Sequence, residues 1–118
     1  MNSYKDLEIW KDSVNLVKEI YKIIPVLPKI EEYNLKLQLK RAVISIPLNI
    51  AEGKSRKSSK DFASFLTIAF GSLMEVEAIL SICIELNYIK ENIKIKQNIE
   101  KLSKRINKLR GFLKQNEK

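Results

Sequence analysis

The sequence predicts an all-α protein, a single up-down-up-down four-helix bundle over residues 1–118. Apolar residues recur at three-to-four spacing in four separate stretches, and no stretch alternates with the period of two that is typical of strands. Only three glycines and three prolines are present, so a few long elements must account for the chain. A chain of 118 residues is long enough for one proper core but not for two.

The first predicted helix, of about five turns, ends before Pro25 and Pro28, because proline disfavours helix at its own and the preceding position. Ser3 or Asp6 would cap its start. The spacing predicts that its core stripe consists of Leu7, Trp10, Val14, Val17, Tyr21 and Ile24. The aromatic pair Trp10 and Tyr21 could instead stack on nucleic-acid bases, but the burial preference of aromatic residues favours the core.

The second predicted helix covers Glu31–Arg56 and carries Pro47 in its interior. Proline removes the hydrogen bond to the Val43 carbonyl, so we expect a bend there at a cost of about 3 kcal/mol. Gly53 marks the predicted C-terminal cap, before a basic connector. The predicted core stripe is Leu35, Leu39, Val43, Ile46 and Ile50.

The polar face of this second helix differs from an ordinary wet face, where long Lys and Glu side chains are scattered. It carries short polar groups and arginines that share one side of the helix. Such a stripe indicates either a site or a specific interface. Its members are Gln38, Arg41, Ser45, Asn49, Glu52 and Arg56.

The third predicted helix is the longest, with about seven turns, and begins at a capping sequence that includes Ser58 and Asp61. Gly71 and Ser72 lie in its middle, where small residues would let another helix approach closely. Glu75, one turn later, is the candidate counter-charge for Arg41. The predicted core stripe is Phe62, Leu66, Ala69, Leu73, Val76, Leu80 and Cys83, with Cys83 as a small buried hydrophobe rather than a nucleophile.

A short turn at residues 87–89 precedes the last predicted helix, whose core stripe is Ile95, Ile99, Leu102, Ile106, Leu109 and Leu113. Residues 90–118 carry 10 Lys/Arg against 3 Asp/Glu, whereas residues 1–89 carry 12 against 11. The basic face is either a contact surface for nucleic-acid phosphates or a solvated face. We expect the core to use its apolar stripe, which argues against membrane binding. The candidate nucleic-acid contacts are Lys54, Arg56, Lys57, Lys94, Lys101, Lys104, Arg105, Lys108 and Arg110.

The sequence lacks several residue types and motifs on which common enzymes and metal sites depend. Histidine is absent, and a single cysteine allows neither an intrachain disulfide nor a zinc site of the common types. There is no Gly-rich phosphate loop, and a serine without a base is a poor nucleophile. We therefore expect no enzymatic activity, no metal and no cofactor. Without a signal-peptide pattern or an apolar run of membrane-spanning length, the expected location is the cytoplasm.

The segment Gln38–Gly53 resembles the hallmark of a bacterial family first noticed as open reading frames in intervening sequences of large-subunit ribosomal RNA genes. Three further blocks resemble the family, namely Tyr4–Trp10, Phe62–Ser72 with Glu75, and Leu86–Ile89. The resemblance covers nearly all of residues 4–110, although the basic segment after about Lys90 matches no motif. It implies a bundle that assembles into a ring of five subunits. It also implies a similarity in fold to the accessory protein of diversity-generating retroelements, a basic pentameric barrel that works with a reverse transcriptase and nucleic acid.

Two functional hypotheses follow. The first is a non-enzymatic homo-oligomer that binds RNA or DNA through its basic surface. The second is a structural or adaptor oligomer that docks a protein partner, such as a reverse transcriptase, without touching nucleic acid itself. In the second case the polar residues would serve assembly, and the candidates are Gln38, Arg41, Ser45, Asn49, Glu52, Ser72 and Glu75.

Overall fold

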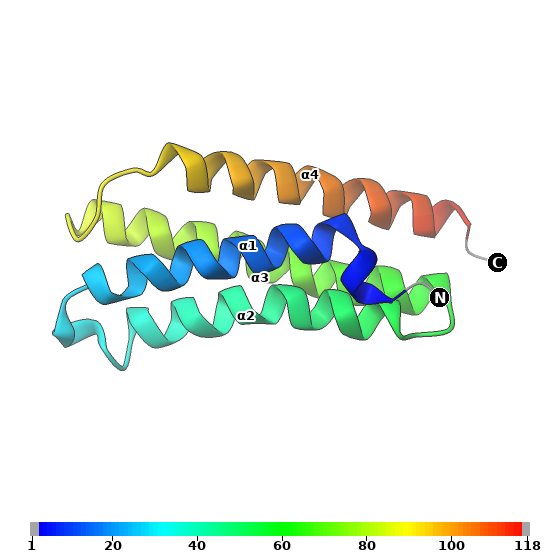
Figure 1. The fold of residues 1–118 in the computed structure, drawn as a ribbon, viewed down its shortest axis with the longest axis horizontal. Helices are drawn as coiled ribbons and strands as arrows, with labels where there is room; N and C mark the ends of the chain where they lie inside the picture. Colours follow the sequence, from blue (N-terminus) through cyan, green and yellow to red (C-terminus); the bar gives the residue numbers. More distant parts are fainter. Residues whose placement is uncertain (1–2, 117–118) are drawn as a thin grey trace.

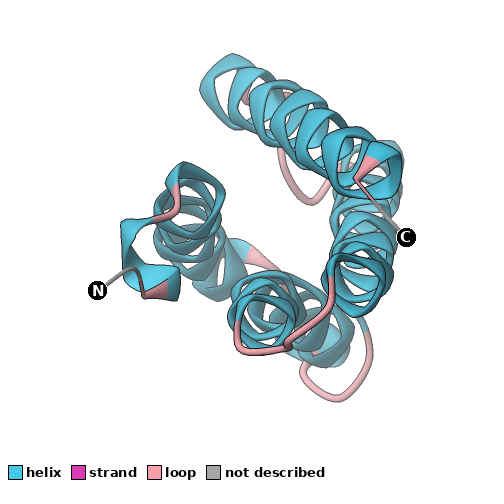
Figure 2. Ribbon diagram, turned by 90° about the vertical axis from the view of Figure 1, so that its right-hand side faces the viewer, coloured by secondary structure: helices cyan, strands magenta, loops and turns pink. Residues whose placement is uncertain are grey.

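The computed structural model describes residues 3–116 as four long helices joined by short connections (Figure 1). The long helices are α1 (Glu8–Ile23), α2 (Leu35–Lys54), α3 (Ser59–Glu85) and α4 (Ile93–Gln115), and the 3-10 turns are η1 (Tyr4–Asp6), η2 (Ile24–Val26) and η3 (Lys29–Glu31). Each helix runs back alongside the previous one, and the end-on view shows them following one another around the core (Figure 2). The body measures 49 × 23 × 22 Å. The predicted all-α, four-helix architecture is confirmed.

The core lies where the sequence predicts it for three of the four helices. The predicted stripes of α2, α3 and α4 are buried almost throughout, with Phe62 and Leu109 only partly covered at the margin. Cys83 is fully buried among them, as expected of a small hydrophobe. By length and apolar composition, α3 is the only helix among the described residues that could cross a membrane. Its buried stripe forms the centre of the bundle, and core helices also meet that criterion.

The predicted core stripe of α1 is only partly correct. Ile24 is buried, whereas Leu7, Trp10 and Val17 lie partly covered at the margin of the core. The buried face carries Ile9, Leu16 and Ile20 together with Ser13, which is fully enclosed and donates its hydroxyl to the Trp10 carbonyl at 2.7 Å. Tyr21 is 44% exposed, so its predicted burial is wrong. The helix has two apolar stripes at helical spacing, and a polar serine interrupts the one that faces the core.

Helix ends follow local sequence signals closely. Ser58 accepts a hydrogen bond from the Asp61 backbone nitrogen at 3.0 Å, which confirms the predicted start of α3. Ser3 caps η1 rather than α1. Residue 87 has φ 63°, the left-handed conformation that asparagine tolerates, and it ends α3 at the predicted turn.

Gly53 lies in the last turn of α2, in the predicted cap region but two residues before the C-cap Ser55. The reason for a glycine is close packing, since an added Cβ would lie 2.8 Å from both Phe62 Cδ1 and Phe65 Cβ. Of the small pair Gly71 and Ser72, Ser72 contacts α2 through Ser45 at 2.8 Å, whereas an added Cβ at Gly71 would meet nothing within 4 Å. α2 is continuous through Pro47, and the bend expected at that residue stays a prediction.

Candidate nucleic-acid interface

The centre of the predicted polar stripe joins α2 to α3. The Ser45 and Ser72 hydroxyls are 2.8 Å apart, and the Asn49 side-chain nitrogen donates to the Ser45 carbonyl and hydroxyl at 2.8 and 2.9 Å. The cluster is partly buried, where an unpaired polar group would be costly. Ser45, Asn49 and Ser72 therefore hold two helices of one chain together.

The rest of the stripe divides into paired and exposed side chains. Gln38 donates to the Asn34 side chain at 2.6 Å, and Glu52 pairs with Arg56 at 3.0 Å. Arg41 and Glu75 are both exposed, and no ion pair joins them in the described part of the chain. Glu75 as the counter-charge of Arg41 within one chain is thus a wrong prediction.

Three of the predicted nucleic-acid cations instead attach α4 to α1. Asp12, whose side chain is 11% exposed, accepts from Arg105 at 2.6 Å and lies 3.7 Å from Lys101. Glu19 lies 3.7 Å from Lys94, and the Asn98 amide donates to it at 2.7 Å. Each of these cations lies within 4 Å of an α1 carboxylate, and Lys101 and Arg105 share the one charge of Asp12. We therefore do not count Lys94, Lys101 and Arg105 as phosphate contacts.

Two other arginines, from outside α3, pack against aromatic rings in its N-terminal half. The Arg56 guanidinium is 4.8 Å from the centre of the Phe65 ring and shares its charge with Glu52. Arg110 lies 5.3 Å from the centre of the Phe70 ring and donates to the Thr67 hydroxyl at 3.3 Å and to the Asn107 side chain at 2.8 Å. No carboxylate pairs with Arg110 in the described part of the chain, so it presents a fixed, unneutralised charge.

Because α2 ends, α3 begins and α4 ends on the same side, two basic segments that are distant in sequence meet at one end of the bundle (Figure 1). We call this surface the basic end; it consists of Lys54, Arg56, Lys57, Lys60, Lys108, Arg110 and Lys114. The five lysines form no ion pair among residues 3–116. Two of them, Lys60 and Lys114, were missed by the sequence-based selection, although Lys114 lies one turn beyond Arg110. Lys104 is exposed one turn before Lys108.

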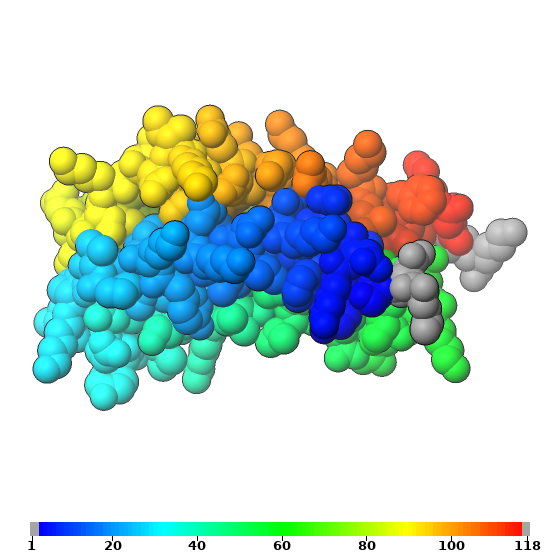
Figure 3. Space-filling model, viewed as in Figure 1, coloured from blue at the N-terminus to red at the C-terminus, as the bar shows by residue number. Residues whose placement is uncertain are grey.

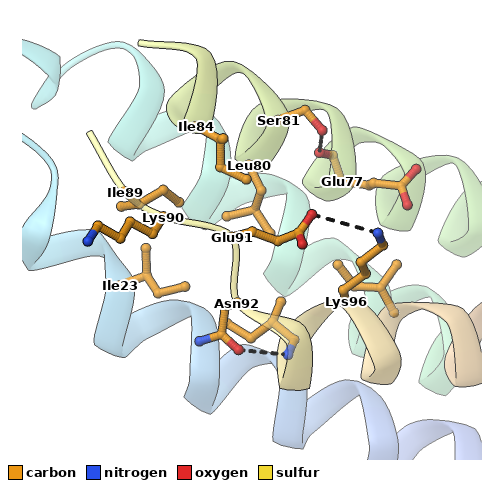
Figure 4. Close-up of a pocket in the computed structure, with 12 residues that line it drawn as sticks. Ile23, Glu77, Leu80, Ser81, Ile84, Ile89, Lys90, Glu91, Asn92 and Lys96 are labelled. Carbon is orange, nitrogen blue, oxygen red and sulfur yellow. Dashed lines mark hydrogen bonds and ion pairs between the residues drawn. The ribbon is translucent and has the colours of Figure 1, made fainter. Parts of the chain in front are cut away.

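A cleft lies at the opposite end, between the end of α3 and the start of α4 (Figure 4). It has a volume of about 180 Å³. Its apolar lining includes Ile23, Leu80, Ile84 and Ile89. The polar residues at its rim already have partners within the chain: Glu91 pairs with Lys96 at 3.7 Å, and Asn92 caps α4.

Two titratable groups near this end are perturbed by their surroundings. The Tyr88 hydroxyl donates to Glu31 at 2.9 Å, and this hydrogen bond raises the pKa of Tyr88. Burial raises the pKa of the Cys83 thiol, which suppresses its reactive thiolate form. Among the described residues no three His, Cys, Asp or Glu side chains are grouped as metal ligands would be.

The family model of the 23S rRNA-intervening sequence proteins matches residues 5–108. Among solved structures, the chain is similar to a protein of unknown function from the S23 ribosomal protein family of Bacteroides thetaiotaomicron. That match has a TM-score of 0.64 and 24% identity, and it covers 89% of this chain and 94% of the other. A comparison with functionally curated proteins found no match. The family match extends over most of the chain, and this protein therefore belongs to the 23S rRNA-intervening sequence protein family.

Proposed function

We propose that this protein is a non-enzymatic, cytoplasmic homo-oligomer that binds RNA, or another nucleic acid, through its basic end. The observation that carries the proposal is that two basic segments without an acidic residue, 54–60 and 108–114, lie at the same end of the bundle. The nearby acids are few: Glu52 is taken by Arg56, and Asp61 lies in the first turn of α3. A polyanion is the ligand class that such a surface attracts most strongly.

The composition of the basic end indicates contacts with phosphates rather than with bases. Most of its cations are lysines, which act on phosphate as mobile point charges and carry no sequence information. Arg110 is held by Phe70 and Thr67, so its guanidinium is prepared for contact with little loss of side-chain entropy. We therefore expect binding that depends strongly on salt and weakly on sequence.

The test is a fluorescence anisotropy titration with a labelled RNA hairpin at low and moderate salt. With about four phosphate contacts, affinity should fall about 100-fold between about 50 and about 200 mM salt. The double variant Lys57→Glu/Lys108→Glu removes two cations and adds two repulsive charges, so its affinity should fall at least about 100-fold at low salt.

The matched control is Lys29→Glu/Lys90→Glu, which changes net charge equally at the opposite end. Its affinity should fall no more than a few-fold. Equal losses in the two variants would mean that binding follows net charge alone. No binding at low salt would refute the nucleic-acid function.

The adaptor hypothesis remains the second candidate, because a partly exposed apolar valley between α1 and α2 is suited to a protein contact. Under that hypothesis the protein assembles but does not bind RNA in the same titration. The partner would then be another protein, such as a reverse transcriptase. The subunit number that the family resemblance implies is five.

A further inference from the structure

The second apolar stripe of α1 faces a valley that α2 completes from the other side. Tyr4, Trp10, Val14, Val17, Ile44, Pro47, Leu48 and Ala51 line this α1–α2 valley. It holds about 270 Å³, and its lining is mainly apolar. Leu48 is 62% exposed, and both helices that form the valley reach the same surface (Figure 3). A water-filled apolar valley of this length is costly to leave uncovered.

A second exposed surface runs along the outside of α3. We call it the α3 ridge; its residues follow 3-4-3-4 spacing and are Ile68, Gly71, Glu75, Ala78 and Ile82. All five are exposed although two are large hydrophobics. Glycine in a helix interior costs about 1 kcal/mol relative to alanine. Among residues 3–116, no atom lies close enough to Gly71 to explain a glycine there.

The ridge carries acids along α3 and the valley is flanked by two cations, although Arg110 of α4 also lies beside the ridge, on Thr67 and Phe70. After Lys60, α3 contains four acids, of which Glu75 lies on the ridge, and no basic residue up to Lys90. Two exposed cations lie next to the lining of the α1–α2 valley, Lys18 on α1 and Arg41 on α2, whereas the neighbouring Glu52 is paired with Arg56. Neither Lys18 nor Arg41 forms an ion pair among residues 3–116. Two surfaces with these charges would attract each other and orient an approaching copy.

We infer that the α3 ridge of one copy of this chain packs into the α1–α2 valley of a second copy. This inference rests on the homo-oligomeric part of the proposed function. The small Gly71 and Ala78 let the ridge approach closely, while Ile68 and Ile82 fill apolar space and Glu75 meets the basic margin. Packing between two copies would then account both for the exposed hydrophobic residues on the two surfaces and for the glycine at position 71.

The contact is head-to-tail, because it joins two different surfaces. Each copy that uses its ridge still offers its valley, so the same contact repeats until a ring closes. A two-fold dimer would instead join one surface to its own copy. The two arrangements make different predictions for mixtures of variants.

The experiment uses sedimentation velocity on the full chain without nucleic acid. Leu48→Glu blocks the valley and Ile68→Glu blocks the ridge; both positions are exposed within the chain, so circular dichroism should show wild-type helix content. Each variant alone should be monomeric. Mixed one to one, they retain one intact valley and one intact ridge between them, and they should form a heterodimer. Ile30→Glu, at an 83% exposed site outside both surfaces, should assemble like the wild type.

The outcomes distinguish failure of the proposed homo-oligomer from failure of the ridge-to-valley contact alone. A monomeric wild type at micromolar concentration would refute the homo-oligomer and this contact with it. A wild type that assembles, with variants that stay assembled or mixtures that stay monomeric, would refute the ridge-to-valley contact alone. A heterodimer in the mixture supports it, since neither a two-fold interface nor a foreign partner produces that result.

Discussion

Gly53 provides a prediction whose sign opposes the ordinary expectation for a helix. A glycine-to-alanine change inside a helix usually stabilises by about 1 kcal/mol, because it reduces the entropy of the unfolded chain. At Gly53 the added methyl would lie 2.8 Å from Phe62 Cδ1 and Phe65 Cβ. The Phe65 Cβ is fixed to the backbone of α3 and cannot rotate away. The two helices must therefore separate locally.

The magnitude follows from the two opposing effects. Overpacking of a fixed contact costs about 1–3 kcal/mol, and two contacts at 2.8 Å place Gly53→Ala toward the upper end. After subtraction of the helix-propensity gain, the net loss of unfolding free energy should be about 1–2 kcal/mol. For a domain of this size the loss corresponds to a fall in Tm of roughly 4–8 °C.

The assay is urea denaturation followed by far-UV circular dichroism at one fixed protein concentration. Gly111→Ala is the matched control, because an added Cβ there meets nothing within 4 Å and the change should raise stability by up to about 1 kcal/mol. A Gly53→Ala variant as stable as the wild type would show that α2 and α3 are not packed as closely as described.

Three smaller effects follow from other contacts. The pKa of Tyr88 should lie above the ordinary tyrosine value in a spectrophotometric titration, and Glu31→Gln should lower it. Because that pKa is raised, the stability from this pair is complete below about pH 10 and is lost as pH rises through the raised pKa. Asp12→Ala leaves Arg105 unpaired, so it should cost up to about 1 kcal/mol in urea denaturation, and the loss should shrink with added salt. Asn87→Val should cost about 1–2 kcal/mol in the same assay, whereas Asn87→Gly should cost nothing.

Periodicity predicts the fold well where a helix has a single apolar stripe. In α2, α3 and α4 the apolar residues leave one possible core face, and that face is buried. In α1 there are two, and local sequence cannot tell which of them meets the core. Ser13 makes the true core face look interrupted, although its hydroxyl is satisfied within the helix. The choice is decided by the neighbouring helices, which the pattern of one segment does not describe.

For the candidate site, too, the sequence predicts features of a single helix but not contacts between helices. Sequence identifies the wet face of α4 correctly, but it does not show that Asp12 and Glu19 stand opposite part of that face. One signal was present, because these acids are seven residues apart, as are Lys94 and Lys101. Equal spacing on two helices becomes an ion-pair ladder only once their pairing and register are known. The meeting of residues 54–60 with residues 108–114 likewise follows from topology and not from local composition.

Lysine acetylation footprinting with and without an RNA hairpin tests most directly whether the basic end is the binding surface. Bound RNA should protect Lys57, Lys60, Lys108 and Lys114, while Lys29 at the opposite end stays as reactive as in the free protein. Lysines already paired with α1 acids should change little, because their contacts are the same in both states. Protection spread evenly over all exposed lysines, or stronger at Lys29 than at Lys57, would contradict the assignment of nucleic-acid binding to the basic end.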